Sequence, residues 1–211
     1  MTDPSHHRHS WRLTSGFRVL LVIGGPGSGK GVLCDRLVQE AGVKHFSSGQ
    51  ALRNEVASGS CLGRSIAHLL EEGQLVPPCT MIALLKKQLG KFPGQLLVLD
   101  GFPRTLQNYH DFDDICGAPE GAIYIDVPDE VMVDRILIRG KSGSGRSDDN
   151  LETAKTRIDT FHELTKPTLD NLQTSGIPVY TLDGKGTPDN VWHQFVSMYP
   201  PIHHRVQSWT G

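Results

Sequence analysis

Five short runs of aliphatic and β-branched residues recur along the chain, and longer segments with apolar residues at helical spacing separate them. Most runs are continuously apolar instead of alternating, a pattern typical of strands that are buried on both faces of a parallel sheet. Strands that alternate with helices predict an α/β fold of the doubly wound type, with helices outside the sheet. The predicted strands cover residues 17–23, 44–47, 95–99, 122–127 and 179–182.

Helices are predicted in the segments between these runs. The last and longest of them contains Pro167, and because proline lacks a backbone N–H and clashes with the preceding turn, we expect a kink or a break there. The interior stretch 140–147 is rich in Gly and Ser, a composition that predicts flexibility. The predicted helices cover residues 30–41, 49–58, 63–72, 79–89, 128–139 and 151–175.

The length of 211 residues suits one well-packed domain better than two full-sized ones. The first sixteen residues and residues 199–211 are polar and without clear periodicity, so we expect disordered tails around a domain at 17–198. The first tail contains His6, His7 and His9, which we expect to be solvated because partner ligands for a metal are lacking.

The formal charge of −2, with both signs scattered along the chain, excludes a broad electrostatic surface for DNA, RNA or an anionic membrane. No run approaches the roughly 20 apolar residues of a membrane span, and the chain starts without an apolar signal segment or an Arg-rich leader. We therefore expect a cytoplasmic monomer whose partners are small molecules. The cysteines are too widely spaced for a paired zinc motif or a secreted disulfide framework, so we expect reduced thiols at Cys34, Cys61, Cys79 and Cys116.

A glycine-rich loop joins the first predicted strand to the first predicted helix. Its sequence fits the pattern G-x-x-x-x-G-K in the strand-loop-helix context that this pattern requires. The glycines let backbone N–H groups turn inward around an anion, the helix N-terminus adds positive potential, and Lys30 reaches the β- and γ-phosphates. A tight turn with an incidental lysine is the alternative, but the context favours a site for ATP or GTP. The loop residues expected at the phosphates are Gly25, Pro26, Gly27, Ser28, Gly29, Lys30 and Gly31.

The same loop lacks the side chain that usually holds the metal. Gly31 stands where most such loops have Ser or Thr, whose hydroxyl binds Mg²⁺. The metal must then rely on water and carboxylates, and Asp100 is the natural candidate because parallel strands place their carboxyl ends beside the loop after the first strand. We assign Asp100 to Mg²⁺ through water. The alternative is a capping or turn aspartate before Gly101.

Six motifs follow one another in an order that resembles the adenylate kinase and UMP/CMP kinase family, from about residue 17 to residue 196. The resemblance implies a three-layer P-loop NTPase fold with about five parallel strands, an NMP-binding subdomain at about 47–77 and a short lid at about 140–148. It also implies reversible, Mg-ATP-dependent phosphoryl transfer to a nucleoside monophosphate. The motifs are 24–31, 45–49 with Arg53, 73–77, 100–104, Arg135 with 139–140, and 144–150.

Six arginines occupy positions in or beside these motifs. A transferring phosphoryl group needs in-line positioning and charge neutralisation more than covalent help, and the planar fork of arginine binds phosphate oxygens in pairs. A surface ion pair is the alternative for any single arginine, and a poor one for all six together. The resemblance implies that Arg53 and Arg104 hold the acceptor phosphate and that Arg135 and Arg139 lie beside the ATP phosphates. It also implies that Arg146 and Arg157 close over the reaction.

The resemblance also completes the sets of expected site residues. The expected catalytic residues are Lys30, Arg104, Arg135, Arg146 and Arg157. The expected acceptor site comprises Ser48, Arg53, Val76, Gly101, Arg104, Asn108, Arg146 and Arg157.

Residues 140–147 are then a short lid that brings Arg146 onto the phosphates and excludes water, which limits wasteful hydrolysis of ATP. This lid has no cysteine, unlike the zinc-binding lid of many long-lid members. Two interpretations of the residues after the lid remain open. Asp148 and Asp149 orient lid arginines, or Asp149 with Glu152 forms a capping box at a helix start.

Two positions depart from the family pattern. Val32 stands where the family usually has Thr beside the α-phosphate of ATP, so this ATP-site residue offers no hydroxyl. Gln50 replaces the usual Asp near the acceptor. These departures affect the expected rate and the exact acceptor, and leave the reaction class unchanged.

The residue expected to read the acceptor base is Asn108, four positions after Arg104. Adenylate kinases typically have Gln there and UMP/CMP kinases Asn, although one methylene changes discrimination by only about 1–3 kcal/mol. Ser48 lies between the two patterns, Thr105 favours AMP, and the lid sequence favours UMP or CMP. We lean toward a pyrimidine monophosphate because the side chain that faces the base edge is the more direct evidence. AMP is the alternative acceptor.

The alternative from another functional class is a regulatory role, in which the protein binds ATP but no longer catalyses phosphoryl transfer. Val32 and Gln50 support it, but the cations needed only for the transition state are retained. A GTPase is disfavoured because the Asn-Lys-x-Asp guanine motif is missing from the sequence.

Overall fold

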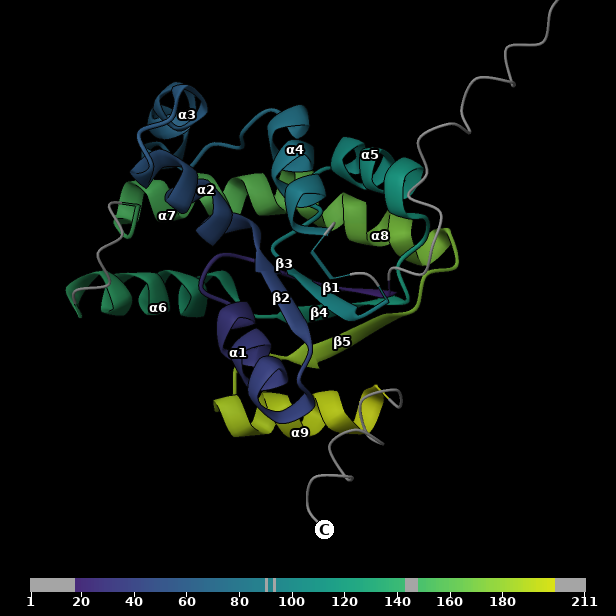
Figure 1. Cartoon of the computed structure of the whole chain (residues 1–211). Helices are drawn as coiled ribbons and strands as arrows, with labels where there is room; N and C mark the ends of the chain where they lie inside the picture. The colour runs from purple at the N-terminus through teal and green to yellow at the C-terminus, as the bar shows by residue number, and fades with distance from the viewer. Residues whose placement is uncertain (1–17, 90, 93, 143–147, 200–211) are drawn as a thin grey trace, which may run out of the picture.

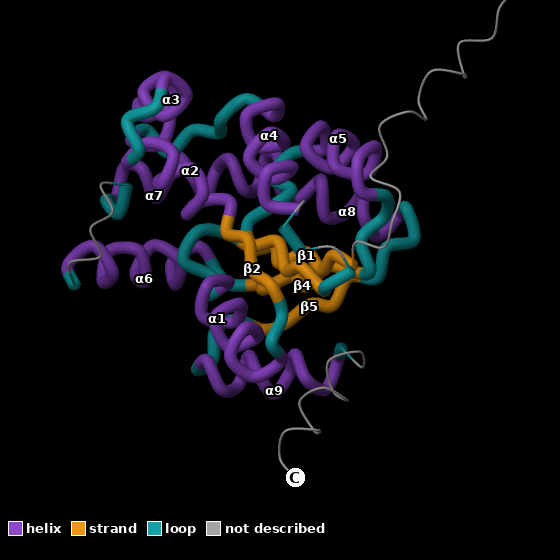
Figure 2. The backbone as a smooth tube through the Cα atoms, viewed as in Figure 1, coloured by secondary structure: helices purple, strands orange, loops and turns teal. Residues whose placement is uncertain are grey.

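The computed structural model describes residues 18–89, 91–92, 94–142 and 148–199. The tail expected at 1–16, Arg146 and most of the expected lid lie outside the described residues. Within them, five strands form one parallel sheet with the order β2-β3-β1-β4-β5, which confirms the predicted sheet (Figures 1 and 2). Each predicted run matches its strand to within one residue at either end. The strands are β1 (Arg18–Gly24), β2 (Lys44–Ser47), β3 (Leu96–Asp100), β4 (Gly121–Asp126) and β5 (Val179–Asp183).

Helices cover both faces of the sheet (Figure 1). Successive side chains of a strand point to opposite faces, and in β1 Leu21 belongs to one buried cluster and Leu20 to the other. The first cluster includes residues of α4, α5 and α8, and the second includes residues of α1 and α9. The helices are α1 (Lys30–Ala41), α2 (Ser48–Ala57), α3 (Cys61–Glu71), α4 (Pro78–Leu89), α5 (Leu106–Cys116), α6 (Asp129–Lys141), α7 (Leu151–Thr160), α8 (Lys166–Thr174) and α9 (Pro188–Met198).

The strand order places the carboxyl end of β1 at a switch point. Strand β1 pairs with β3 on one side and with β4 on the other. The strands β2 and β3 therefore lie on one side of β1, and the strands β4 and β5 lie on the other. The register sets Val22 and Ser47 opposite Asp100, and Gly101 N donates to Val22 O at 3.0 Å. Ligands of open α/β sheets bind in the crevice at such a point.

The kink or break expected at Pro167 takes the form of a change in helix type, with the chain helical throughout. A π-helical turn, η2 (Phe161–Thr165), separates α7 from α8, and Pro167 lies in the first turn of α8. Proline removes one hydrogen-bond donor and crowds the turn before it, and a π-helical turn accommodates both effects. The predicted helix at 151–175 is therefore three successive helical segments.

Two helices were absent from the predicted set. Helix α5 has a polar sequence with a weak apolar stripe, and Thr105 caps it by accepting from Asn108 N. Helix α9 carries a clear start signal that the prediction overlooked, since Thr187 and Asn190 form a capping box around Pro188. Both helices bury aromatic residues in the core, so their packing stabilises them beyond their intrinsic propensity.

Tyr199, which the expected boundary at residue 198 assigns to the C-terminal tail, packs against the domain. Tyr199 is buried, stacks on Phe195 and meets Tyr180 edge to face. Its hydroxyl donates to Glu120 at 3.2 Å, so the last described residue belongs to the core. In the described part of the chain, every helix is too short or too polar to cross a bilayer.

Candidate active site

The glycine-rich loop connects β1 to α1 at the carboxyl edge of the sheet. Gly27 and Gly29 have positive φ angles of 78° and 98°, which favour glycine. A Cβ on Gly25 would lie 2.2 Å from Met132 Sδ, and one on Gly27 would lie 2.7 Å from Met132 O. Gly29 offers no side chain to cap α1, so the first N–H groups of this helix face the loop as an anion site.

Lys30 folds back over this loop. Its Nζ donates to Gly24 O at 2.8 Å, to Gly25 O at 2.7 Å and to Ser28 Oγ at 3.3 Å. Burial lowers the pKa of Lys30 to about 8, and the charge of Asp100 opposes this shift. A phosphate that entered the loop would supply the anionic partner that the ammonium group needs in a buried site.

Asp100 ends β3 beside the loop and lines the same cavity. Burial on its own would raise the pKa of this carboxyl, but the interaction with His45 and the charge of Lys30 outweigh it and hold the pKa below its usual value. The carboxylate is therefore ionised at neutral pH. An ionised carboxylate on the wall of a phosphate-binding cavity fits the expected role toward hydrated Mg²⁺.

Two cavities of about 550 Å³ each meet at this edge of the sheet. The first extends from the glycine-rich loop to the N-terminal part of α9, and the second lies between α2, α3 and the start of α5. Among the described residues, the arginines in the walls of both cavities are Arg53, Arg104 and Arg157. Two substrates bound in these cavities would therefore meet at a concentration of positive charge.

Each of the shared arginines is held by a neighbour. Arg104 donates through Nε to Gly101 O at 3.0 Å, and Arg157 forms an ion pair of 2.7 Å with Asp148. Arg53 donates through Nη2 to Gln50 Oε1 at 3.0 Å. Guanidinium groups fixed by neighbours lose little conformational entropy when they bind a phosphate.

Burial lowers the pKa of Arg104 to about 10, and the charge of Arg157 adds to the shift. The two guanidinium groups therefore repel each other in the free protein. An anion between them would relieve this repulsion, which is the electrostatic arrangement expected of a phosphate site.

Of the other expected arginines, the two that the structure describes line the first cavity and not the second. Arg139 forms a bidentate pair with Asp149, with distances of 2.8 and 2.6 Å, and Arg135 donates to Lys185 O at 3.3 Å. Asp149 thus orients Arg139, the residue directly before the expected lid. The capping-box interpretation was wrong, because Asn150 caps α7 by accepting from Thr153 N.

Asn108 lines the second cavity, as do Val76 and Arg53. It is buried, and its Oδ1 accepts from Arg104 N at 3.4 Å. Ser48 lines the first cavity, and its hydroxyl donates to Gly101 O at 2.8 Å. Its hydroxyl therefore supports the turn after β3.

The structure adds residues that the sequence analysis missed. Trp192 and Arg36 both line the first cavity, with the guanidinium carbon 4.7 Å from the ring centroid. Thr165 lies in η2 and donates to Arg104 O at 3.0 Å, which ties the arginine to the helical break. A Trp in the last helix gave no local signal, since only the fold brings it to the loop. For Thr165 the sequence did contain a signal, because Pro167 marks the helical irregularity in which Thr165 lies.

Comparisons with known proteins agree with this geometry. A family model described as "ADK: Adenylate kinase" matches residues 22–177. Human adenylate kinase isoenzyme 1 is 38% identical over 179 residues, which cover 84% of this chain and 91% of that protein. Adenylate kinase of Deinococcus radiodurans is 39% identical over 189 residues, 85% of this chain and 95% of that protein. Probable UMP-CMP kinase 2 of Arabidopsis thaliana is 36% identical over 182 residues, 86% and 69% respectively.

Proposed function

The chain belongs to the adenylate kinase family and is a nucleoside monophosphate kinase, and from this premise we propose that its acceptor is a pyrimidine nucleoside monophosphate, UMP or CMP. The reaction is ATP + NMP = ADP + NDP. Two adjoining cavities, which share Arg53, Arg104 and Arg157 in their described walls, support the placement of the two substrates.

The donor nucleotide occupies the first cavity. Its β- and γ-phosphates lie in the glycine-rich loop, where Lys30 exchanges its contacts with loop carbonyls for contacts with phosphate oxygens. Arg135 and Arg139 stand on the same cavity beside these phosphates. Asp100 would hold Mg²⁺ through water, and the ion would supply charge neutralisation at the phosphates of ATP.

The acceptor occupies the second cavity, with its phosphate on Arg53 and Arg104. This position directs an acceptor phosphate oxygen toward the γ-phosphate across the shared wall. Arg157 reaches both substrates and stabilises the charge that develops between them. No protein nucleophile is needed, because phosphoryl transfer depends on alignment and charge neutralisation.

Asn108 supports the pyrimidine acceptor. Its Oδ1 is engaged by the backbone N–H of Arg104, so its Nδ2 is the group that offers a donor to a base. A short amide suits the acceptor atoms on the edge of cytosine or uracil, which are nearer to the phosphate than those of a purine positioned by the same arginines.

AMP is the second candidate acceptor. Two of the relatives described above are named adenylate kinase, and Thr105 agrees with them. Ser48 lies between the two sequence patterns and its hydroxyl donates to Gly101 O, so it favours neither acceptor.

A coupled assay with Mg·ATP and a panel of AMP, CMP, UMP, dCMP and GMP tests the proposal. We expect the specificity constant kcat/KM to be largest for CMP or UMP. A preference for AMP of more than about a hundredfold would identify the second candidate as the acceptor. Failure of every monophosphate, with intact binding of ATP, would support the regulatory alternative.

A further inference from the structure

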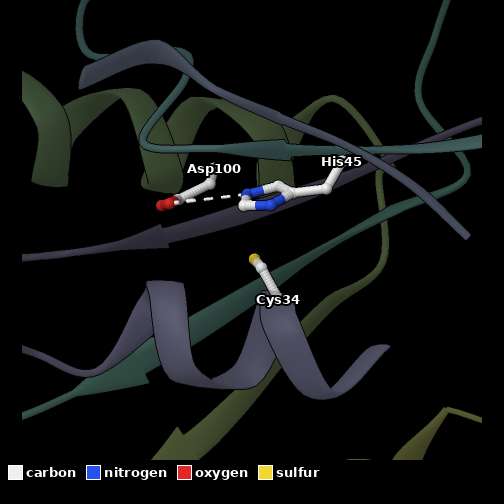
Figure 3. A group of neighbouring side chains, drawn as sticks. All are labelled: Cys34, His45 and Asp100. Carbon is white, nitrogen blue, oxygen red and sulfur yellow. Dashed lines mark ion pairs between the residues drawn. The ribbon is translucent and has the colours of Figure 1, made fainter. Parts of the chain in front are cut away.

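A buried group of three side chains lies beneath the carboxyl end of the sheet, next to the proposed nucleotide site. Cys34 is fully buried on α1, and His45 and Asp100 come from the neighbouring strands β2 and β3. In the parallel register His45 pairs with Val98 and Ser47 pairs with Asp100, so His45 and Asp100 point to the same face. Figure 3 shows the Cys34 sulfur directed from α1 toward the His45 ring, with Asp100 facing that ring.

The three side chains place their ligand atoms close together. The Cys34 sulfur, a ring nitrogen of His45 and a carboxylate oxygen of Asp100 all lie within 4.8 Å of one another, and Nε2 and Oδ2 are 3.7 Å apart. One point therefore lies within about 2.8 Å of all three atoms, whereas zinc binds such ligands at roughly 2.0–2.3 Å. A contraction of about half an ångström per ligand would complete a coordination site.

The ring nitrogen of His45 is a second indication, because its pairing with Asp100 falls short of a hydrogen bond. Its Nε2 is buried and has no hydrogen-bond partner among the described residues. The 3.7 Å distance to Asp100 exceeds that of a hydrogen bond. A buried ring nitrogen without a hydrogen bond is unusual in folded proteins and calls for a ligand, an ion or a water.

We propose that Cys34, His45 and Asp100 form a binding site for a thiophilic divalent cation of the Zn²⁺ class. A thiolate and a carboxylate together balance the two positive charges, and the neutral imidazole adds a third ligand without charge. The complex is therefore electrically neutral, which suits its burial. The sulfur and nitrogen ligands disfavour Mg²⁺, which prefers oxygen.

Coordination involves a defined change in protonation. Burial raises the pKa of the Cys34 thiol well above its usual value, so the sulfur carries its proton in the free protein. As the metal–sulfur bond forms, this proton passes to solvent. The side chains of His45 and Asp100 are 18% and 12% exposed, and Asp100 lines the first cavity, from which the ion and a water as fourth ligand would approach.

The same geometry links this site to turnover, a step that rests on the proposed function. Asp100 lines the nucleotide cavity and is the residue assigned to hydrated Mg²⁺. A zinc-class ion that drew its carboxylate toward Cys34 would remove it from the nucleotide. Binding should therefore inhibit the kinase reaction.

Titration of the full-length protein with Cd²⁺, under reducing conditions without a thiol reagent, tests the site directly. The ultraviolet charge-transfer band of a thiolate–Cd²⁺ bond should appear and saturate at one equivalent. The band that saturates at one equivalent should be absent in Cys34→Ala, in which the exposed thiols of Cys61 and Cys79 give a band only at excess Cd²⁺. In His45→Gln the band should require at least about tenfold more Cd²⁺. The matched control is Cys116→Ala, whose half-buried thiol lies elsewhere and should leave the band unchanged. Histidines of the tails give no thiolate band.

Unfolding measurements show whether each variant is folded. Cd²⁺ should raise the Tm of the wild type and of Cys116→Ala, and should leave the Tm of folded Cys34→Ala unchanged. Equal bands in the wild type and Cys34→Ala, or no band in the wild type, would overturn the proposal. Inhibition of turnover by free Zn²⁺ should be weaker in Cys34→Ala. A Cys34-dependent band without inhibition would retain the site and reject its link to the reaction.

Discussion

The pKa of Lys30 makes the affinity for ATP depend on pH in a window where ordinary lysines do not titrate. In the free protein, burial lowers this pKa from 10.5 to about 8. The neutral form therefore accumulates as the pH rises through about 8, whereas the bound polyphosphate requires the charged form. We expect ATP binding above this pH to take up a proton and to weaken.

The magnitude follows from the fraction of charged lysine. At pH 7 nearly all Lys30 side chains are charged, and at pH 9 about one tenth are, so the apparent Kd for ATP should rise about tenfold between these values. Arg104 does not contribute in this range because its pKa is lowered only to about 10. In the free protein the unfolded chain binds more protons than the folded state between pH 8 and 10.5, so the shift also makes the unfolding free energy rise with pH there.

Equilibrium binding of ATP without turnover, measured between pH 7 and 9, is the appropriate assay. Lys30→Arg provides the control, because its guanidinium keeps its charge over the whole range and reports any titration of the nucleotide itself. The affinity of this variant should be lower and nearly independent of pH. A wild-type affinity that is constant from pH 7 to 9, or equal slopes for both proteins, would refute the reasoning.

Three further predictions concern the two substrates and Arg139. Gln50→Ala removes the acceptor that holds Arg53 Nη2 and should raise the KM for the monophosphate about fivefold with the KM for ATP unchanged, and equal rises in both would contradict it. Asn108→Gln adds one methylene and should shift the AMP-to-CMP ratio of kcat/KM toward AMP by about tenfold to a hundredfold, while an unchanged ratio would place this side chain away from the base. Asp149→Ala leaves the 31% exposed Arg139 without its bidentate partner and should lower the unfolding free energy in urea by about 1–2 kcal/mol, a loss that Asp149→Glu should reduce.

The sheet and most helices could be predicted because their signals are local. Continuous apolar runs marked the strands, and the pattern G-x-x-x-x-G-K fixed the position of the loop that Lys30 covers. Pro167 marked the break in the long C-terminal helix for a local steric reason. Helix α9 was also predictable from a local signal, because the capping box at Thr187 is present in the sequence.

Other features depend on contacts that the sequence order does not contain. Asp149 was compatible with a capping box and with an arginine pair, and only the packing of α6 against α7 selected the pair with Arg139. Similarly, Trp192 enters the first cavity because α9 packs beside α1, where Arg36 lies over its ring. For such residues the local sequence is compatible with more than one set of contacts, and tertiary packing determines which contacts form.

The group of Cys34, His45 and Asp100 illustrates how topology creates chemistry that spacing conceals. Widely separated cysteines argued against a metal motif, because such motifs are recognised by pairs of ligands a few residues apart. In a parallel sheet the relevant spacing is instead the register between strands, which places His45 and Asp100 on one face, and the helix that covers this face adds Cys34. The proposed cation site therefore depends on the same strand order that brings Asp100 to the phosphate loop. Substitution of Cys34 tests the two roles separately, since it removes the sulfur ligand and leaves the carboxylate in place.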